Sequence, residues 1–274
     1  MLKLYICSFF LLVINSLSPS WAISTHESTN QSLQEKLLKA IEHKDLNQVK
    51  HLVEQGVSLA IATQAEVTNQ AHADSYNHFL RRAVFVGSLP ILQYLLDHGA
   101  ELETQLPYSS FSGMSLPNIL TSAINSKSSD SQEMVRTLLN AGANPNLIGN
   151  GDYAEDDIPL LNALSLEKYE IAQLLLSYGA DPNVYTPNHD RPLWDAVETK
   201  DVQAVTLLIN AGTDVNLPPK DSLTLTKAIC HDDSSRLALD AARAQPGEAS
   251  AQIEKLLLSA GARSIKDLCH QAGL

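Results

Sequence analysis

Apolar residues recur at helical spacing along the chain, in short segments that each end on a glycine. Six leucine-rich segments share this form: QVKHLVEQG, ILQYLLDHG, MVRTLLNAG, IAQLLLSYG, AVTLLINAG and IEKLLLSAG, which end at Gly56, Gly99, Gly142, Gly179, Gly212 and Gly261. Glycine readily adopts the left-handed conformation that often follows a helix. The pattern therefore predicts six amphipathic helices, each ending at its glycine.

A second, earlier helix is predicted before each of these segments, because a leucine is followed by an alanine three residues later. The pairs are Leu37 and Ala40, Leu80 and Ala83, Leu120 and Ala123, Leu160 and Ala163, Leu193 and Ala196, and Leu239 and Ala242. The interval from this alanine to the next glycine is 16 residues in four repeats and 19 in two. The longer intervals contain the turn-rich insertions SKSSDS and AQPGEAS. Pro159 and Pro192 precede their leucines, as expected for the first turn of a helix.

This unit resembles the ankyrin repeat, which has the signature Thr-Pro-Leu-His-x-Ala and a period of about 33 residues. The match is closest in IPLLNALSLEKYEIAQLLLSYGADPN and RPLWDAVETKDVQAVTLLINAGTDVN. The resemblance implies an all-α solenoid of about six helix pairs with β-hairpin finger loops. Leu161 and Trp194 replace the histidine that ordinarily links neighbouring loops. Tetratricopeptide repeats have a similar period but lack Gly-Ala after the second helix, and HEAT repeats are longer.

The repeats divide the chain into an ankyrin-repeat domain at 32–264 and short terminal segments. The expected repeats lie at about 34–60, 77–105, 117–147, 158–187, 190–218 and 236–264, followed by a C-terminal tail or cap at 265–274. Ser32 and Glu35 form a predicted capping box at the start of the first repeat. The sixth repeat has an alternative start near 223, where Leu225 and Ala228 have the same spacing.

The first 22 residues are typical of a signal peptide, with Lys3, an apolar run and small residues before a cleavage site after Ala22. An uncleaved N-terminal anchor is the alternative, although the run is shorter than the roughly 20 residues that span a bilayer. Residues 23–31 are expected to be a flexible lead-in. The chain is thus identified as an exported protein of bacterial type, placed in the periplasm or, alternatively, secreted. No stable membrane insertion is expected after cleavage.

The mature chain is acidic, which limits the class of partner. Without Lys3 it carries 18 basic and 31 acidic residues, a net charge of −13. Nucleic acid needs a basic surface, so it is excluded as a partner. The charge allows a protein partner with a basic patch, although acidity also serves solubility.

Four of the five connections between repeats carry insertions, near 57–78, 100–118, 143–158 and 213–237. Insertions in a repeat array gather on one face, often the binding face. In the segment GNGDYAEDDIP, we expect Tyr153, Asp156 and Asp157 to form an acidic, aromatic tip, with a solvated turn as the alternative.

Aromatic residues in other connections are further candidate protein-binding residues. Tyr108 and Phe111 lie in the second inserted connection, where they either contact a partner or cover the insertion itself. Tyr185 lies in the connection before the fifth repeat, and Trp194 stands at the start of its first helix. Trp194 is either displayed or buried between repeats.

No motif for catalysis, metal binding or cofactor binding occurs in the sequence. Neither a zinc-ligand spacing, a nucleophile elbow nor a phosphate-binding loop is found, so we expect no enzyme activity, no metal and no cofactor. Cys230 and Cys269 are candidates for a disulfide in an oxidising compartment, worth roughly 4 kcal/mol in the chain-entropy model.

The resemblance implies a non-catalytic protein-binding module acting outside the cytoplasm. The alternative is a secreted effector or toxin-neutralising protein that binds a foreign target.

Overall fold

The computed structural model describes residues 33–59, 79–102, 118–147, 157–185, 191–217 and 237–273. Within these ranges the chain forms helices and short turns, without any strand. The helices come in successive pairs, so the predicted all-α solenoid of helix pairs is confirmed. The signal peptide, the lead-in, the Ser32 capping residue and the tips of the finger loops lie outside the described residues.

The chain divides into two compact units, at residues 1–101 and 102–274. Unit 1 contains a helix at residues 33–42, α3 (Leu46–Glu54), α4 (Phe79–Val86) and α5 (Leu89–Asp97). Helix α5 packs against both α4 and α3. The core of this unit is apolar and fully buried, and it includes Leu37, Ile41, Leu80, Ile91, Leu92 and Leu95.

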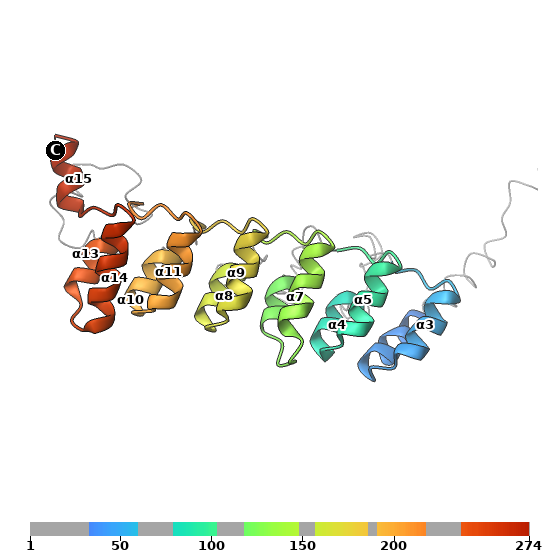
Figure 1. Cartoon of the computed structure of the whole chain (residues 1–274). Helices are drawn as coiled ribbons and strands as arrows, with labels where there is room; N and C mark the ends of the chain where they lie inside the picture. The colour runs from blue at the N-terminus through green and yellow to red at the C-terminus, as the bar shows by residue number, and fades with distance from the viewer. Residues whose placement is uncertain are drawn as a thin grey trace, which may run out of the picture. The chain divides into compact units, whose positions relative to one another are not determined.

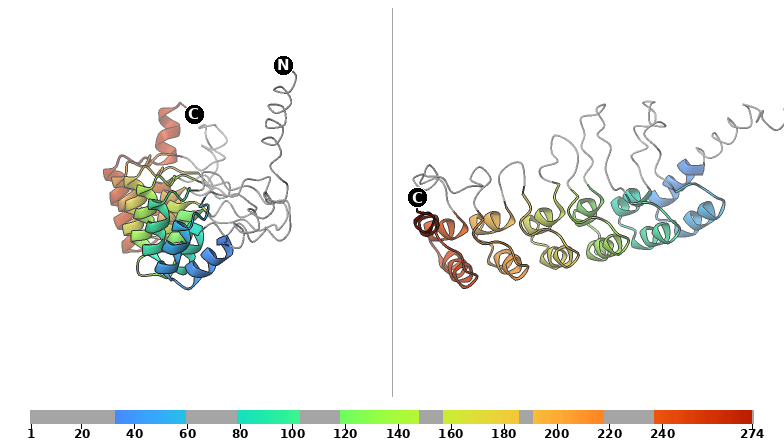
Figure 2. Two further views of the ribbon diagram at one scale, coloured as in Figure 1. Left: turned by 90° about the vertical axis from the view of Figure 1, so that its right-hand side faces the viewer. Right: turned by 90° about the horizontal axis from the view of Figure 1, so that it is seen from above.

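The described residues of unit 2 form four further helix pairs and a C-terminal helix. The pairs are α6 (Ile119–Ile124) with α7 (Ser131–Asn140), α8 (Pro159–Ser165) with α9 (Tyr169–Ser177), α10 (Pro192–Glu198) with α11 (Val202–Asn210), and α13 (Ala238–Ala244) with α14 (Glu248–Ser259). Each first helix packs against the first helix of the next pair, and each second helix against the next second helix, which gives two layers (Figures 1 and 2). The helix α15 (Ile265–Gln271) follows.

The ends of the helices follow the sequence signals. The six predicted glycines all have positive φ, between 81° and 96°, immediately after the second helix of a pair. Pro159 and Pro192 begin α8 and α10, where no N–H is needed. Asp45 and Asp201 cap α3 and α11 by accepting a hydrogen bond from a backbone N–H in the first turn.

In four of the six pairs, the tight turn between the two helices has one residue in the left-handed region. Gly87 takes this place in the second repeat, but the equivalent residues elsewhere are Lys44, Glu167 and Lys200, with φ of 55°, 55° and 61°. Two of these turns also contact a neighbouring repeat. The Lys168 side chain donates to the carbonyl of Ile124, and the Lys200 Nζ donates to the carbonyl of Pro246 at 3.3 Å.

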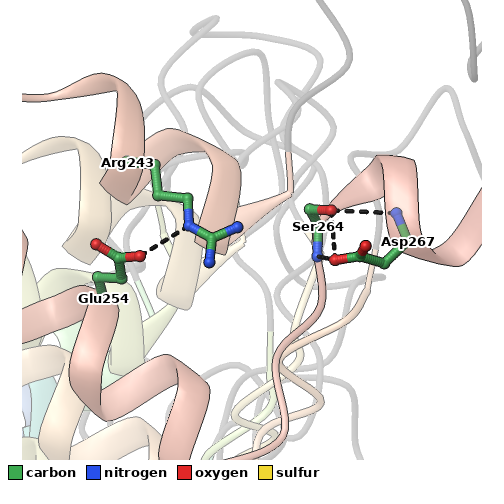
Figure 3. Close-up of polar contacts among 4 residues, drawn as sticks. All are labelled: Arg243, Glu254, Ser264 and Asp267. Atoms are coloured by element: carbon green, nitrogen blue, oxygen red, sulfur yellow. Dashed lines mark hydrogen bonds and ion pairs between the residues drawn. The ribbon is translucent and has the colours of Figure 1, made fainter.

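The last repeat is built on α13 and α14. Leu239 and Ala242 are buried in α13, which packs against both α10 and α14, so this helix occupies the place of a first helix. Arg243 of α13 pairs with Glu254 of α14 at 2.8 Å (Figure 3). This insertion-bearing pair is thus held by an ion pair as well as by its core.

Helix α15 is fixed by its own cap and by α13. Ser264 Oγ accepts from the Asp267 N–H at 3.1 Å, while the Asp267 carboxylate accepts from the Ser264 N–H at 3.3 Å (Figure 3). The bonds from Ser264 lower the pKa of Asp267. Asp240 of α13 accepts from the Ile265 N–H at 2.8 Å, which joins the start of α15 to the last repeat.

Candidate protein-binding site

A row of asparagine side chains joins the bases of the connections in unit 2. The Asn146 amide donates to the carbonyl of Gly179 at 2.8 Å and accepts from the Asp181 N–H at 2.8 Å. The Asn216 amide makes the same two bonds one junction further on, to the carbonyl of Gly261 at 3.2 Å and the Arg263 N–H at 2.8 Å. Each asparagine therefore ties its repeat to the backbone of the next.

Asn183 forms the junction between these two. Its side-chain oxygen accepts from the Asp214 N–H at 2.9 Å and from the Thr213 hydroxyl at 2.8 Å. The side chain two residues before each asparagine accepts from the asparagine's own N–H, which orients it; these residues are Asn144, Asp181 and Asp214. We call Asn146, Asn183 and Asn216 the asparagine ladder.

The asparagine ladder was missed in the sequence, although its signal was present. The stretches Asn-Pro-Asn, Asp-Pro-Asn and Asp-Val-Asn each begin two residues after the terminal glycine of a repeat. An acidic or amide residue two places before an asparagine is typical of a local turn in which the first side chain bonds the backbone. Its recurrence at a fixed distance from the glycine would have predicted the ladder.

Asp157 does not belong to an exposed acidic tip. It is buried, with 6% of its surface exposed, and its carboxylate accepts from the Asn118 N–H at 2.5 Å. Asn118 in turn caps α6 and donates to the carbonyl of Leu147 at 2.6 Å. Asp157 thus links the start of one repeat to the start of the preceding one, and this burial contradicts the predicted contact with a partner.

Tyr185 and Trp194 are brought together with Arg191 at the junction of the fourth and fifth repeats. The Arg191 guanidinium lies over the Tyr185 ring, 5.2 Å from its centre. Trp194 and Arg191 line the same small pocket between the two connections, and all three side chains are half-buried. We call Tyr185, Arg191 and Trp194 the Arg191 site.

The Arg191 side chain lacks any hydrogen bond or ion pair among the described residues. Its Nε is buried without an acceptor. Burial lowers the pKa of the guanidinium, and the nearby carboxylates of Asp214 and Asp181 act in the opposite direction. The stack on Tyr185 compensates for part of this loss of water.

An exposed aromatic residue that the sequence analysis overlooked lies in unit 1. Phe85 is 78% exposed on α4, with the Arg82 guanidinium 5.7 Å from its ring centre. The residues at the same place in other first helices are polar or small: Glu42, Asn125, Ser165, Glu198 and Ala244. Alignment of the repeats on their leucine would have revealed this exception.

The other predicted site residues divide by whether the structure describes them. Tyr108, Phe111, Tyr153, Asp156 and Cys230 lie outside the described residues. Cys269 is buried in α15 and is disulfide-bonded. Its pairing with Cys230 stays a prediction.

Neither a group of potential metal ligands nor a helix of the length and apolar content needed to cross a bilayer occurs among the described residues.

Comparison with known proteins agrees with this architecture. Residues 120–219 match the family model described as ankyrin repeats in three copies. No curated protein sequence matches the chain.

The solved structures that share the fold include the following three. An ankyrin repeat domain from Acinetobacter baumannii is 21% identical, with a TM-score of 0.60, and the match covers 84% of this chain and 100% of that one. The ankyrin repeat domain of Bcl-3, a member of the IkappaB family, is 22% identical with a TM-score of 0.57, over 83% and 86% of the two chains. A chain in the complex of a predatory endopeptidase from Bdellovibrio bacteriovorus with an immunity protein is 24% identical with a TM-score of 0.53, over 82% and 97%.

The stacked helix pairs, the left-handed glycines and these likenesses lead to one conclusion: the chain has the ankyrin-repeat solenoid fold, and residues 120–219 carry the repeats that the family model matches.

Proposed function

We propose that the protein is a non-catalytic protein-binding module that acts outside the cytoplasm. The Arg191 site carries this proposal. It combines an arginine and two aromatic residues, the residue types that dominate binding energy at protein interfaces, on a rigid repeat scaffold. Binding here needs no chemistry, only the fixed presentation of these side chains.

Within each unit, the binding surface in this proposal consists of the first helices and the connections. In unit 1 it includes Phe85, because an aromatic side chain that is 78% exposed gains the most from burial by a partner. The two exposed leucine and tyrosine side chains on the second helices, Leu258 and Tyr178, lie outside the proposed surface.

The sequence of the connections favours a partner with a basic patch. Connections 57–78, 100–118, 143–158 and 181–190 contain ten acidic residues and no lysine or arginine, whereas connection 213–237 contains four acidic and three basic residues. Such a one-sided charge attracts a basic surface and increases the rate of encounter. Asp157 is one of these ten residues but is buried, so the negative charge offered to a partner comes from the other nine.

Affinity purification of the protein from extracts of its own cell envelope tests the proposal. Wild-type protein is expected to retain a specific partner, and the Trp194→Ala and Phe85→Ser variants to retain less of it. Leu258→Ser is the matched control, since it removes an exposed apolar side chain from a second helix. Equal capture by all four proteins would contradict the proposed surface.

Export is supported by the first 22 residues, with their short apolar run and the small residues that precede the expected cleavage site. Fractionation followed by N-terminal sequencing is expected to yield a periplasmic protein that begins at Ile23. Recovery from the culture medium would favour secretion, and an uncleaved chain in the membrane fraction would contradict both.

A second candidate function is the neutralisation of another protein's activity. It is favoured by the likeness in fold to a chain from the complex of an endopeptidase with an immunity protein. The captured partner would then be an enzyme, and its activity would fall when the purified protein is added in stoichiometric amounts. A partner whose activity is unaffected would exclude this function and leave the binding module intact.

A further inference from the structure

Arg191 occupies a position in its repeat at which the equivalent residues elsewhere in unit 2 are buried and leave no side-chain polar atom without a partner. The equivalent residues of the other repeats of unit 2 are Asn118, Ile158 and Leu237, all at most 2% exposed. The Asn118 side chain caps α6 with its oxygen and donates its N–H to the carbonyl of Leu147, and the two apolar residues need no partner. Arg191 instead brings five N–H donors to this position.

Within the part of the chain that the structure describes, the Nε–H donor of Arg191 is held in place but not used. The Nε–H is buried without an acceptor, and the only described contact of the guanidinium is the face of the Tyr185 ring at 5.2 Å. A buried donor without an acceptor costs free energy, so an acceptor supplied from outside would bind favourably. The stacked ring limits the motion of the guanidinium, which lowers the entropic cost of that bond.

The pocket beside Arg191 sets the size of the acceptor. Its cavity volume is about 20 Å³, which holds roughly one water-sized group. Leu193, Trp194, Val215 and Leu217 form its apolar wall, while Asn183 and Asp214 lie at its polar side. One oxygen atom fits such a cavity, whereas a carboxylate brings two oxygens.

The charges around the site disfavour an anion as well. Asp214 and Asp181 act electrostatically on Arg191, and both are exposed. One positive and two negative charges give a small excess of negative charge. An incoming carboxylate would add to this excess and lose its own hydration, but an uncharged carbonyl would do neither.

We propose that the pocket beside Arg191 receives a main-chain carbonyl oxygen from an extended segment of the partner, with the adjacent partner side chain lying on Trp194. The inference rests on the proposed protein-binding function and specifies the chemistry that one part of its surface recognises. A single ordered water in the pocket is the competing occupant.

The test uses peptides selected from a random peptide library displayed on phage, with the purified full chain as bait. Arg191→Lys keeps the charge but loses the planar guanidinium donor. It is expected to raise the dissociation constants of the selected peptides about tenfold. Arg136→Lys on α7 is the matched control and is expected to change them less than twofold, because exposed pairs contribute little. Unchanged thermal midpoints show that the variants are folded.

A double-mutant cycle then identifies the acceptor. Each amide of a selected peptide is replaced in turn by a thioamide, whose sulfur is larger and accepts hydrogen bonds more weakly. One replacement is expected to weaken binding to the wild type about fivefold and to have little further effect on Arg191→Lys. In the complex, the Nε–H resonance of Arg191 should exchange more slowly with water.

Three results would overturn the proposal. They are equal peptide affinities for wild type and Arg191→Lys, failure to select any peptide, and coupling of Arg191 to an acidic peptide side chain when that side chain is neutralised. None of these three results changes the capture of a partner from envelope extract by the wild-type protein, which is measured separately. The proposed function itself would be contradicted if the wild-type protein captured no partner there.

Discussion

The two units hold neighbouring repeats together by different polar contacts. In unit 2 the asparagine ladder bonds the backbone of the next repeat at each of three junctions. In unit 1 the described links between repeats are made by side chains: Arg82 pairs with Glu42 at 3.6 Å, and Lys50 lies 5.6 Å from the centre of the Tyr94 ring. Four residues after the terminal glycines of unit 1 stand Ala60 and Glu103, where unit 2 has its asparagines.

The two kinds of contact between repeats differ in strength and in their dependence on salt. Exposed ion pairs contribute up to about 1 kcal/mol and weaken with salt. Hydrogen bonds from an amide to the backbone contribute about 1 kcal/mol each and depend little on salt. Both units contain fully buried leucines, such as Leu95 and Leu175, so the contrast between the units concerns their polar contacts.

The largest effect is expected where the units do not differ. Leu95→Ala in unit 1 and Leu175→Ala in unit 2 each empty a position that is 0% exposed, which should lower the free energy of unfolding by about 2–5 kcal/mol. Denaturant titration measures the loss, and hydrogen exchange locates it. A loss several kcal/mol greater in one unit would show that the cores differ as well.

Asp157→Ala should cost about 1–3 kcal/mol, because it leaves the buried Asn118 N–H without its acceptor. Asp157→Asn is the control, since its carboxamide oxygen can still accept the bond. Chemical denaturation of both variants measures the difference. If the alanine variant is as stable as the wild type, the link between these two repeats contributes nothing.

Asn183→Ala removes two accepted bonds from the asparagine ladder and should cost about 1–2 kcal/mol at any ionic strength. Glu42→Gln removes the ion pair of unit 1 and should cost about 0.2–1 kcal/mol, less in high salt. Unfolding measured at low and high salt separates the two. The contrast between the units would be refuted by equal salt dependence. Asn210→Ala is the control, because Asn210 is exposed at the end of α11 and its replacement should leave the free energy of unfolding nearly unchanged.

The smallest effect concerns a hydrogen bond between side chains in unit 2. The Tyr169 hydroxyl donates to Asp201 at 2.9 Å, and burial together with this bond raises the pKa of Tyr169 to about 12. An unfolded tyrosine titrates near pH 10, so the contribution of this bond is complete below about pH 10 and is lost as the pH rises to about 12. Thermal midpoints of the wild type should fall further over this range than those of Tyr169→Phe, and parallel curves would contradict the assignment.

The sequence predicted the helix pairs well because glycine, proline and leucine act locally. Gly179 and Pro192 end and begin helices through their own backbone preferences, with no information from distant residues. The resemblance to ankyrin repeats then supplied the arrangement of the pairs. Long-range polar partners were harder to predict, because Asp157 and Asn118 are 39 residues apart and nothing local joins them.

The candidate site was predicted only in part for the same reason. Tyr185 and Trp194 were recognised as aromatic residues in or beside a connection, but Arg191 between them was not. A lone arginine in a sequence is ordinarily a solvated charge. Only the folded chain reveals that its Nε is buried and that no described residue accepts its hydrogen bond.

The asparagine ladder also bears on how such a protein diversifies. Its acceptors and donors in the next repeat are mostly backbone atoms, and the sequence distance across a junction ranges from 30 to 47 residues. A neighbouring repeat can therefore change its side chains, and a finger its length, without breaking the joint. Mutation is then free to act on the recognition loops while the frame is inherited unchanged, so a new binding specificity can evolve without a new scaffold.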